Sequence, residues 1–120
     1  MTELLVVGGG KMGEALIGGL LRSGWPAAPD LAVAEPDAAR REQLVAAFPG
    51  IVVSKGPLVA DGAIIAVKPQ HAVDVCRQLG MYGIPRILSI AAGVRVAALE
   101  AELPEGTTAS DLVLCVTEML

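Results

Sequence analysis

Aromatic residues are almost missing from this sequence, whose 120 residues include one Trp, one Tyr and one Phe. Hydrophobic residues nevertheless make up 53% of the chain, so Val, Ile, Leu and Ala must fill its core. Parallel strands buried on both faces read as continuous aliphatic runs of this kind. The composition therefore favours an α/β fold with a covered parallel sheet, and the length suits a single domain.

Long apolar runs are missing as well. None approaches the roughly 20 residues that a membrane-spanning helix needs, because Glu14, Arg22 and several glycines interrupt the best candidate. The N-terminus also lacks the basic segment, apolar stretch and small-residue cleavage site of a secretory signal. We therefore expect a cytoplasmic protein without a membrane partner.

Cysteine and positive charge are scarce. Cys76 and Cys115 show no CxxC spacing and no nearby Cys or His, which predicts buried thiols and no metal site. Nine Lys and Arg residues stand against 13 Asp and Glu residues, giving a net charge of −4. Nucleic acids require a basic binding surface, so no nucleic-acid partner is expected.

The chain does contain aliphatic runs that alternate with helical periodicities. Strands are predicted at 4–7, 31–34, 51–53, 63–67 and 87–90, and helices at 12–22, 37–48, 70–79 and 96–103. This order predicts a doubly wound, Rossmann-type parallel sheet with the first strand central. Residues 1–106 are expected to form this one domain, followed by a segment at 107–120 with a candidate sixth strand at 112–116.

The apolar spacing also predicts which helical residues face the core, and Asp37 is expected to cap the second helix. The expected inward residues are Met12, Leu16 and Leu20 in the first helix, Leu44, Val45 and Phe48 in the second, and Val73, Cys76 and Leu79 in the third.

A glycine-rich turn follows the first strand and opens the first helix. It has the pattern G-x-G-x-x-G, formed by Gly8, Gly9, Gly10, Lys11, Met12 and Gly13 directly after Val7. In such a turn the first glycine permits a tight bend, the second leaves room for a pyrophosphate, and the third lets the helix approach the sheet. The helix N-terminus then offers N–H groups to the phosphates. Glycines that merely form a turn are the alternative reading.

Glu35 ends the second strand, near the spacing expected for the acid that binds the adenosine ribose. A solvated loop carboxylate would be the alternative. Glu35 and Asp37 would repel a 2′-phosphate, and at most one of Arg40 and Arg41 is expected to reach back to the ribose and offset them. We therefore predict NADP or NAD as the cofactor, bound comparably, with a slight preference for NADH.

Three stretches of this sequence resemble pyrroline-5-carboxylate reductases, and they occur in the order found in that family. They are Val7 to Leu16, Ala66-Val67-Lys68-Pro69-Gln70, and Ser89-Ile90-Ala91-Ala92-Gly93-Val94. The resemblance covers about residues 3–106, and it implies that residues 1–106 form the NAD(P)-binding domain and that 107–120 is a divergent segment. It implies that two segments line the nicotinamide and ribose side of the cofactor, namely Ala66, Val67, Lys68 and Pro69, and Ala91, Ala92 and Gly93.

Two charged or titratable residues near these segments need a separate interpretation. Lys68 either steers a carboxylate or phosphate or is a solvent-exposed lysine at a strand end. His71 lies one turn into a predicted helix, so it is interpreted as a surface residue. The resemblance gives no catalytic residue in this chain.

The sequence also departs from the family. The loop 54–61 is shorter than in most relatives, so the family's adenine-side asparagine has no match. Where relatives continue into a Met-Pro-Asn-Thr-Pro-like motif, this sequence runs from Asp111 to Leu120 without it. The resemblance thus implies that the C-terminal helical domain, which builds the homo-oligomer and the imine site, is absent and that this chain alone is inactive.

Three functions remain open at this point. The leading one is reduction of 1-pyrroline-5-carboxylate to proline with NADPH or NADH, this chain supplying the cofactor domain. A deazaflavin-dependent NADP reductase has a similar opening, although the pairing of Lys68-Pro69-Gln70 with Ala91-Ala92-Gly93 favours the first. A non-catalytic dinucleotide-binding module is the third.

Overall fold

The computed structural model describes residues 2–90 and 108–111. Strands and helices alternate along the chain. The strands are β1 (Leu4–Val7), β2 (Leu31–Ala34), β3 (Val52–Ser54), β4 (Gly62–Ile65), β5 (Arg86–Ser89) and β6 (Thr108–Asp111). The helices are α1 (Lys11–Ser23), α2 (Ala38–Ala47) and α3 (Pro69–Met81), with a 3-10 helix η1 at Ala28–Asp30.

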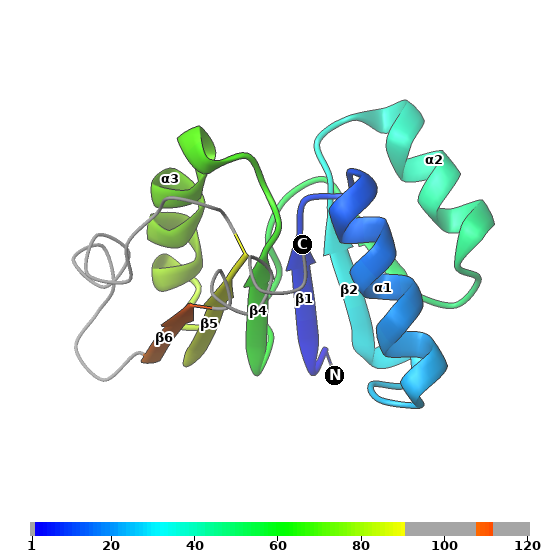
Figure 1. Ribbon diagram of the computed structural model, residues 1–120, viewed down its shortest axis with the longest axis horizontal. Coiled ribbons are helices and arrows are strands. Elements are labelled where there is room, and N and C mark those ends of the chain that lie inside the picture. Colours follow the sequence, from blue (N-terminus) through cyan, green and yellow to red (C-terminus); the bar gives the residue numbers. More distant parts are fainter. Residues whose placement is uncertain (1, 91–107, 112–120) are drawn as a thin grey trace.

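The six strands form one parallel sheet in the order β3-β2-β1-β4-β5-β6 (Figure 1). The chain leaves β1 toward one edge to build β2 and β3, then crosses back to build β4 on the other side of β1. The strand order therefore reverses between β1 and β4, and ligands of open parallel sheets bind at such a point. The predicted doubly wound fold is confirmed.

Alternate strand residues build two cores, one on each face of the sheet. Leu5 and Val7 of β1 belong to the core on the α3 side, together with the α3 residue Cys76. Leu4 and Val6 point to the opposite face, where residues of α1 and α2 cover them. In Figure 1 α1 and α2 lie over one half of the sheet and α3 over the other. Every β1 residue is thus buried, as the aliphatic run predicted.

Two helices present somewhat different faces than the apolar spacing predicted. Met12 is 48% exposed and Val45 is 55% exposed, so both predicted core positions are wrong. The buried face of α1 instead centres on Gly13 and Ile17. In α3 the prediction was right for Cys76, which is fully buried.

The structure also bears on the predicted cap of the second helix and on the edge of the sheet. Asp37 occupies the N-cap position of α2, but its side chain makes no capping hydrogen bond. A sixth strand is present at Thr108–Asp111, pairing with β5. The run 112–116 predicted for that strand lies outside the described residues, as does the helix predicted at 96–103. No helix within the described residues is long and apolar enough to cross a membrane.

Candidate functional site

The turn between β1 and α1 requires glycine at both ends. Gly8 has a φ of +111°, and a Cβ on it would lie 2.6 Å from the carbonyl oxygen of Ala66. A Cβ on Gly13 would lie 1.9 Å from the carbonyl oxygen of Gly8. The two glycines therefore allow the bend and bring the start of α1 against the end of β1.

Gly10 differs from these two, because its surroundings are open. It is exposed, and a Cβ on it would meet no protein atom within 4 Å. Gly10 is also the N-cap of α1, and its carbonyl accepts the first helical hydrogen bond from the N–H of Glu14 at 2.8 Å. The N–H groups of the first helical turn consequently have no helical carbonyl to bond, and they carry partial positive charge.

Glu35 holds the turn from the β2 side. Its Oε1 accepts a hydrogen bond from the N–H of Gly9 at 3.1 Å, and its Oε2 accepts one from the N–H of Asp37 at 2.9 Å. Its own N–H donates to the carbonyl of Ser54 at 2.9 Å, which ties the end of β2 to β3. Glu35 is therefore a half-buried structural anchor of the turn and not a freely solvated carboxylate.

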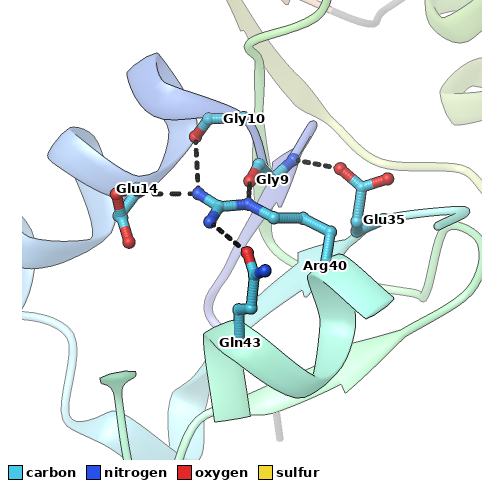
Figure 2. A network of polar contacts seen from close by, with 6 residues as sticks. All are labelled: Gly9, Gly10, Glu14, Glu35, Arg40 and Gln43. Carbon is cyan, nitrogen blue, oxygen red and sulfur yellow. Dashed lines mark hydrogen bonds and ion pairs between the residues drawn. The ribbon is translucent and has the colours of Figure 1, made fainter. Parts of the chain in front are cut away.

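Arg40 holds the same turn from α2 (Figure 2). Its guanidinium donates Nε–H to the carbonyl of Gly9 and Nη2–H to the carbonyl of Gly10 at 3.4 Å. It also donates to Gln43 Oε1 at 2.9 Å and lies 3.6 Å from Glu14 Oε2. Glu35 and the Arg40 guanidinium lie on either side of Gly9 in this view. The turn is thus fixed before any ligand arrives.

Arg41 also reaches back toward the strand ends. It donates Nη1–H to the carbonyls of Glu35 and Pro36, at 2.9 and 2.7 Å. Both arginines thus reach back to backbone carbonyls beside the turn, while the expectation that at most one of them reaches the ribose stays a prediction. Each side chain is long enough to return from the first turn of α2, and unpaired backbone carbonyls there attract both.

Replacing Arg40 with methionine should lower the free energy of unfolding by about 1.5 kcal/mol, because hydrogen bonds from a charged donor to the carbonyls of Gly9 and Gly10 are lost. The Arg40 side chain is 22% exposed, so solvent only partly screens these contacts. Urea denaturation followed by circular dichroism measures the change.

Arg86→Met is the matched control for that substitution. The Arg86 side chain is exposed, and no polar partner is found for it among the described residues. Its loss should change stability by less than about 0.5 kcal/mol. Equal effects of the two substitutions would show that Arg40 does not hold the turn.

A cleft of about 460 Å³ opens beside the turn, over the carboxyl ends of β1, β2 and β4. Its floor includes Val7, Gly8, Ala34 and Val67. The remaining lining comes from Pro36, from the loop after β3 (Lys55, Gly56 and Pro57), and from α3 (His71, Asp74, Val75 and Gln78). The apolar floor and polar rim suit a flat ring that carries polar edges.

The structure brings many of the predicted site residues together. Val7, Gly8 and Val67 line the cleft, and Ala66 packs its carbonyl against Gly8. Gly9, Gly10, Lys11, Met12 and Gly13 form the turn and the first helical residues beside it. Lys68 and Pro69 are exposed at the start of α3. The predicted residues Ala91, Ala92 and Gly93 lie outside the described residues.

Sequence reasoning missed the α3 wall and the loop after β3. His71 is exposed, as expected of a surface residue, but it also lines the cleft. The four lining residues of α3 are spaced i, i+3, i+4 and i+7, which is one helix face. This spacing could have predicted the α3 wall from the sequence, because α3 follows a strand that ends beside the glycine turn. Among the described residues no group of His, Cys, Asp or Glu could hold a metal ion.

The arrangement suits a ligand that joins an anion to a flat ring. The open position at Gly10 and the N–H groups of α1 favour a phosphate. The adjoining cleft has room for a ring, and the Glu35 carboxylate, which accepts the N–H of Gly9, is a hydrogen-bond acceptor beside the turn.

Comparisons with known proteins agree with this geometry. Residues 3–93 match the family described as "NADP oxidoreductase coenzyme F420-dependent". The chain is 36% identical over 110 residues to the pyrroline-5-carboxylate reductase of Pasteurella multocida and 39% identical over 106 residues to that of Pseudomonas aeruginosa. These matches cover 85% and 84% of this chain, but 40% and 38% of the relatives. The chain thus spans about 40% of the length of the curated relatives it matches.

Solved structures show the same fold at lower identity. A pyrroline-5-carboxylate reductase from Coxiella burnetii superposes with a TM-score of 0.79 at 23% identity, covering 90% of this chain and 42% of that one. The pyrroline carboxylate reductase of Plasmodium falciparum, solved with NADP bound, gives 0.73 at 21% identity and covers 90% and 40%. A prephenate dehydrogenase from A. aeolicus in complex with NAD⁺ gives 0.74 at 17% identity and covers 88% and 39%.

Proposed function

We propose a function from the premise that this chain belongs to the family described as "NADP oxidoreductase coenzyme F420-dependent", which its residues 3–93 match. The family makes the chain part of an NAD(P)-dependent oxidoreductase. Its role in such an enzyme is to bind the dinucleotide. The observation that carries this role is the preformed turn, open only at Gly10 and held by Glu35 and Arg40.

The residues present fit NADP or NAD. The pyrophosphate would lie at Gly10 and the N–H groups of Lys11 and Met12, where a side chain at position 10 would otherwise stand. Glu35 would accept a hydrogen bond from the adenosine ribose while still holding Gly9, because each carboxylate oxygen has more than one lone pair. The cleft beneath Pro36 would take the adenine ring.

The reaction we propose for the whole enzyme is reduction of 1-pyrroline-5-carboxylate to proline. The reduced nicotinamide would supply a hydride to the imine carbon, and a proton would go to the imine nitrogen. Support comes from the curated relatives, which carry this enzyme's name. This chain's part is to fix the cofactor. Hydride transfer also needs the imine in near-attack geometry, which cofactor binding alone does not supply. In the whole enzyme, residues beyond the region that matches here would hold the imine and form the homo-oligomer.

A second candidate is hydride exchange between NADP and a deazaflavin, which the description of the matching family favours. The two candidates require the same dinucleotide site and differ in the second reactant. Addition of a deazaflavin to the chain loaded with NADPH discriminates between them. Oxidation of NADPH by the deazaflavin would favour this second candidate.

Titration with NADPH and NADH tests the dinucleotide site. We expect both to bind with comparable affinity and NADH slightly tighter, because the carboxylate of Glu35 accepts a ribose 2′-OH but repels a 2′-phosphate. Glu35→Ser should shift the balance toward NADPH. It should lower the affinity for NADH by about tenfold, the equivalent of about 1.4 kcal/mol of binding free energy. The loss is expected because the substitution removes a charged hydrogen-bond acceptor that also holds Gly9.

Glu35→Gln provides the matched control, because it removes the charge and keeps the length. Glutamine keeps an acceptor oxygen at one of the two terminal positions and places an NH2 donor at the other, so only one of the hydrogen bonds from the N–H groups of Gly9 and Asp37 can be kept. The ratio of NADPH to NADH affinity is therefore expected to lie between those of the native chain and Glu35→Ser. A large native preference for NADPH that Glu35→Ser leaves unchanged would show that Glu35 does not contact the ribose. Absence of binding by both cofactors would refute the proposed function itself.

A further inference from the structure

We propose that Lys55, on the loop after β3, binds the 2′-phosphate of NADPH and thereby determines how well this chain accepts the phosphorylated cofactor. The inference rests on the proposed function and assigns one of its specificity-determining residues. It concerns a loop that the sequence pattern did not mark as part of the site.

The position of Lys55 follows from the pairing of β2 with β3. The register pairs Ala34 with Ser54, and the N–H of Glu35 donates to the carbonyl of Ser54 at 2.9 Å. The next residues of the two strands, Glu35 and Lys55, therefore leave the sheet side by side. Lys55 and Pro36 both line the cleft proposed for the adenosine half of the cofactor. Lys55 thus lies on the ribose side of that cleft.

The nearby arginines already have partners. Arg40 donates to the carbonyls of Gly9 and Gly10, and Arg41 donates to those of Glu35 and Pro36. Either arginine could bind a phosphate only by giving up contacts that hold the turn or the end of β2. Lys55 is exposed, and no hydrogen bond or ion pair of its ammonium group is found among residues 2–90. It can therefore take up an anion without breaking a native contact.

Charge also favours Lys55 for this role. A 2′-phosphate carries between one and two negative charges at neutral pH, and Glu35 would stand beside it as a like charge. The Lys55 ammonium group, on the neighbouring strand end, offsets this repulsion for NADPH. NADH carries a hydroxyl at the same place and has little need of the lysine. Lys55 should consequently affect one cofactor and leave the other almost unchanged.

The test compares the affinities of NADPH and NADH in the full chain by equilibrium titration, for the native protein and three variants. Lys55→Met should lower the affinity for NADPH by about three- to tenfold, as expected for one exposed charge pair with a phosphate. It should change the affinity for NADH by less than twofold. Lys55→Arg should restore the native ratio of NADPH affinity to NADH affinity. Arg86→Met is the matched control, since Arg86 is another exposed basic residue but lies at the amino end of β5 and does not line the cleft.

The outcomes separate this inference from the proposed function. Unchanged NADPH affinity in Lys55→Met, or an equal loss in Arg86→Met, would overturn the assignment of Lys55 while leaving dinucleotide binding intact. An equal loss of affinity for NADPH and NADH in Lys55→Met would mean that the lysine contacts a group that both cofactors share. That result would also overturn the assignment of Lys55 to the 2′-phosphate. A native chain that binds neither cofactor would refute the proposed function, and this inference with it.

Discussion

Replacing Gly13 with alanine is expected to destabilise the chain by about 3 kcal/mol, the upper range for forcing an extra carbon into a packed site. The added Cβ would lie 1.9 Å from the carbonyl oxygen of Gly8 and 3.0 Å from its carbonyl carbon. Both are backbone atoms, so no side-chain rotation relieves the contact. Relief requires α1 to move away from β1, which loosens the packing of Ile17 in the core. Chemical denaturation measures the loss.

Gly19→Ala is a control within the same helix. A Cβ there would have Arg22 Nη2 as its nearest neighbour, at 3.9 Å, which is ordinary contact. Alanine in a helix interior is more favourable than glycine by about 0.5–1 kcal/mol, so this variant should be more stable than the native chain. If Gly13→Ala matched the native stability, the close approach of α1 to the turn described here would be wrong.

The sheet followed from the sequence because each strand is an aliphatic run bounded by glycine, proline or charge. The first two strands were predicted to the residue, and β5 differs by one residue at each end. Parallel strands covered on both faces need apolar side chains at every position, so their signal is strong. The 3-10 helix at Ala28–Asp30 carried no such signal, since three residues bury little and depend on local turns.

The faces of the helices were harder to predict than their lengths. Met12 shares a four-residue spacing with Leu16 and Leu20, which favoured a buried position. The contact between Gly13 and Gly8 instead fixes which side of α1 meets the sheet, and a neighbouring residue is rotated by about 100°. Met12 consequently faces outward. Glycine carries no hydrophobic signal, so a periodicity of apolar residues could not reveal this constraint.

The candidate site was predictable where it depends on backbone and unpredictable where side chains cross between elements. The positions of Gly8, Gly10 and Gly13 followed from a spacing pattern that reflects the turn itself. The hydrogen bonds of Arg40 to the turn join residues 30 and 31 positions apart, and nothing in a local pattern specifies such pairs. The wall formed by α3 depends on the strand order of the whole sheet.

Replacing Gly10 with valine is expected to lower the affinities for NADPH and NADH alike by on the order of 100-fold, the equivalent of about 2.7 kcal/mol of binding free energy. A branched side chain at this position would fill the space in front of the α1 N-terminus, where the pyrophosphate would accept several charge-assisted hydrogen bonds. Because both cofactors carry the pyrophosphate, their affinities should fall together. This distinguishes the variant from Lys55→Met and Glu35→Ser, which change the ratio of the two affinities.

The fold should tolerate the same substitution. Gly10 has φ −73° and ψ −166°, an extended conformation open to any residue, and a Cβ there meets no protein atom within 4 Å. The free energy of unfolding of Gly10→Val should therefore stay within about 1 kcal/mol of the native value, and Gly10→Ala should lose less affinity than the valine variant. Calorimetric titration and urea denaturation of the same samples measure both quantities. Native affinity in a folded Gly10→Val protein would mean that the phosphates bind elsewhere, since a side chain at position 10 and a pyrophosphate cannot share the space before α1.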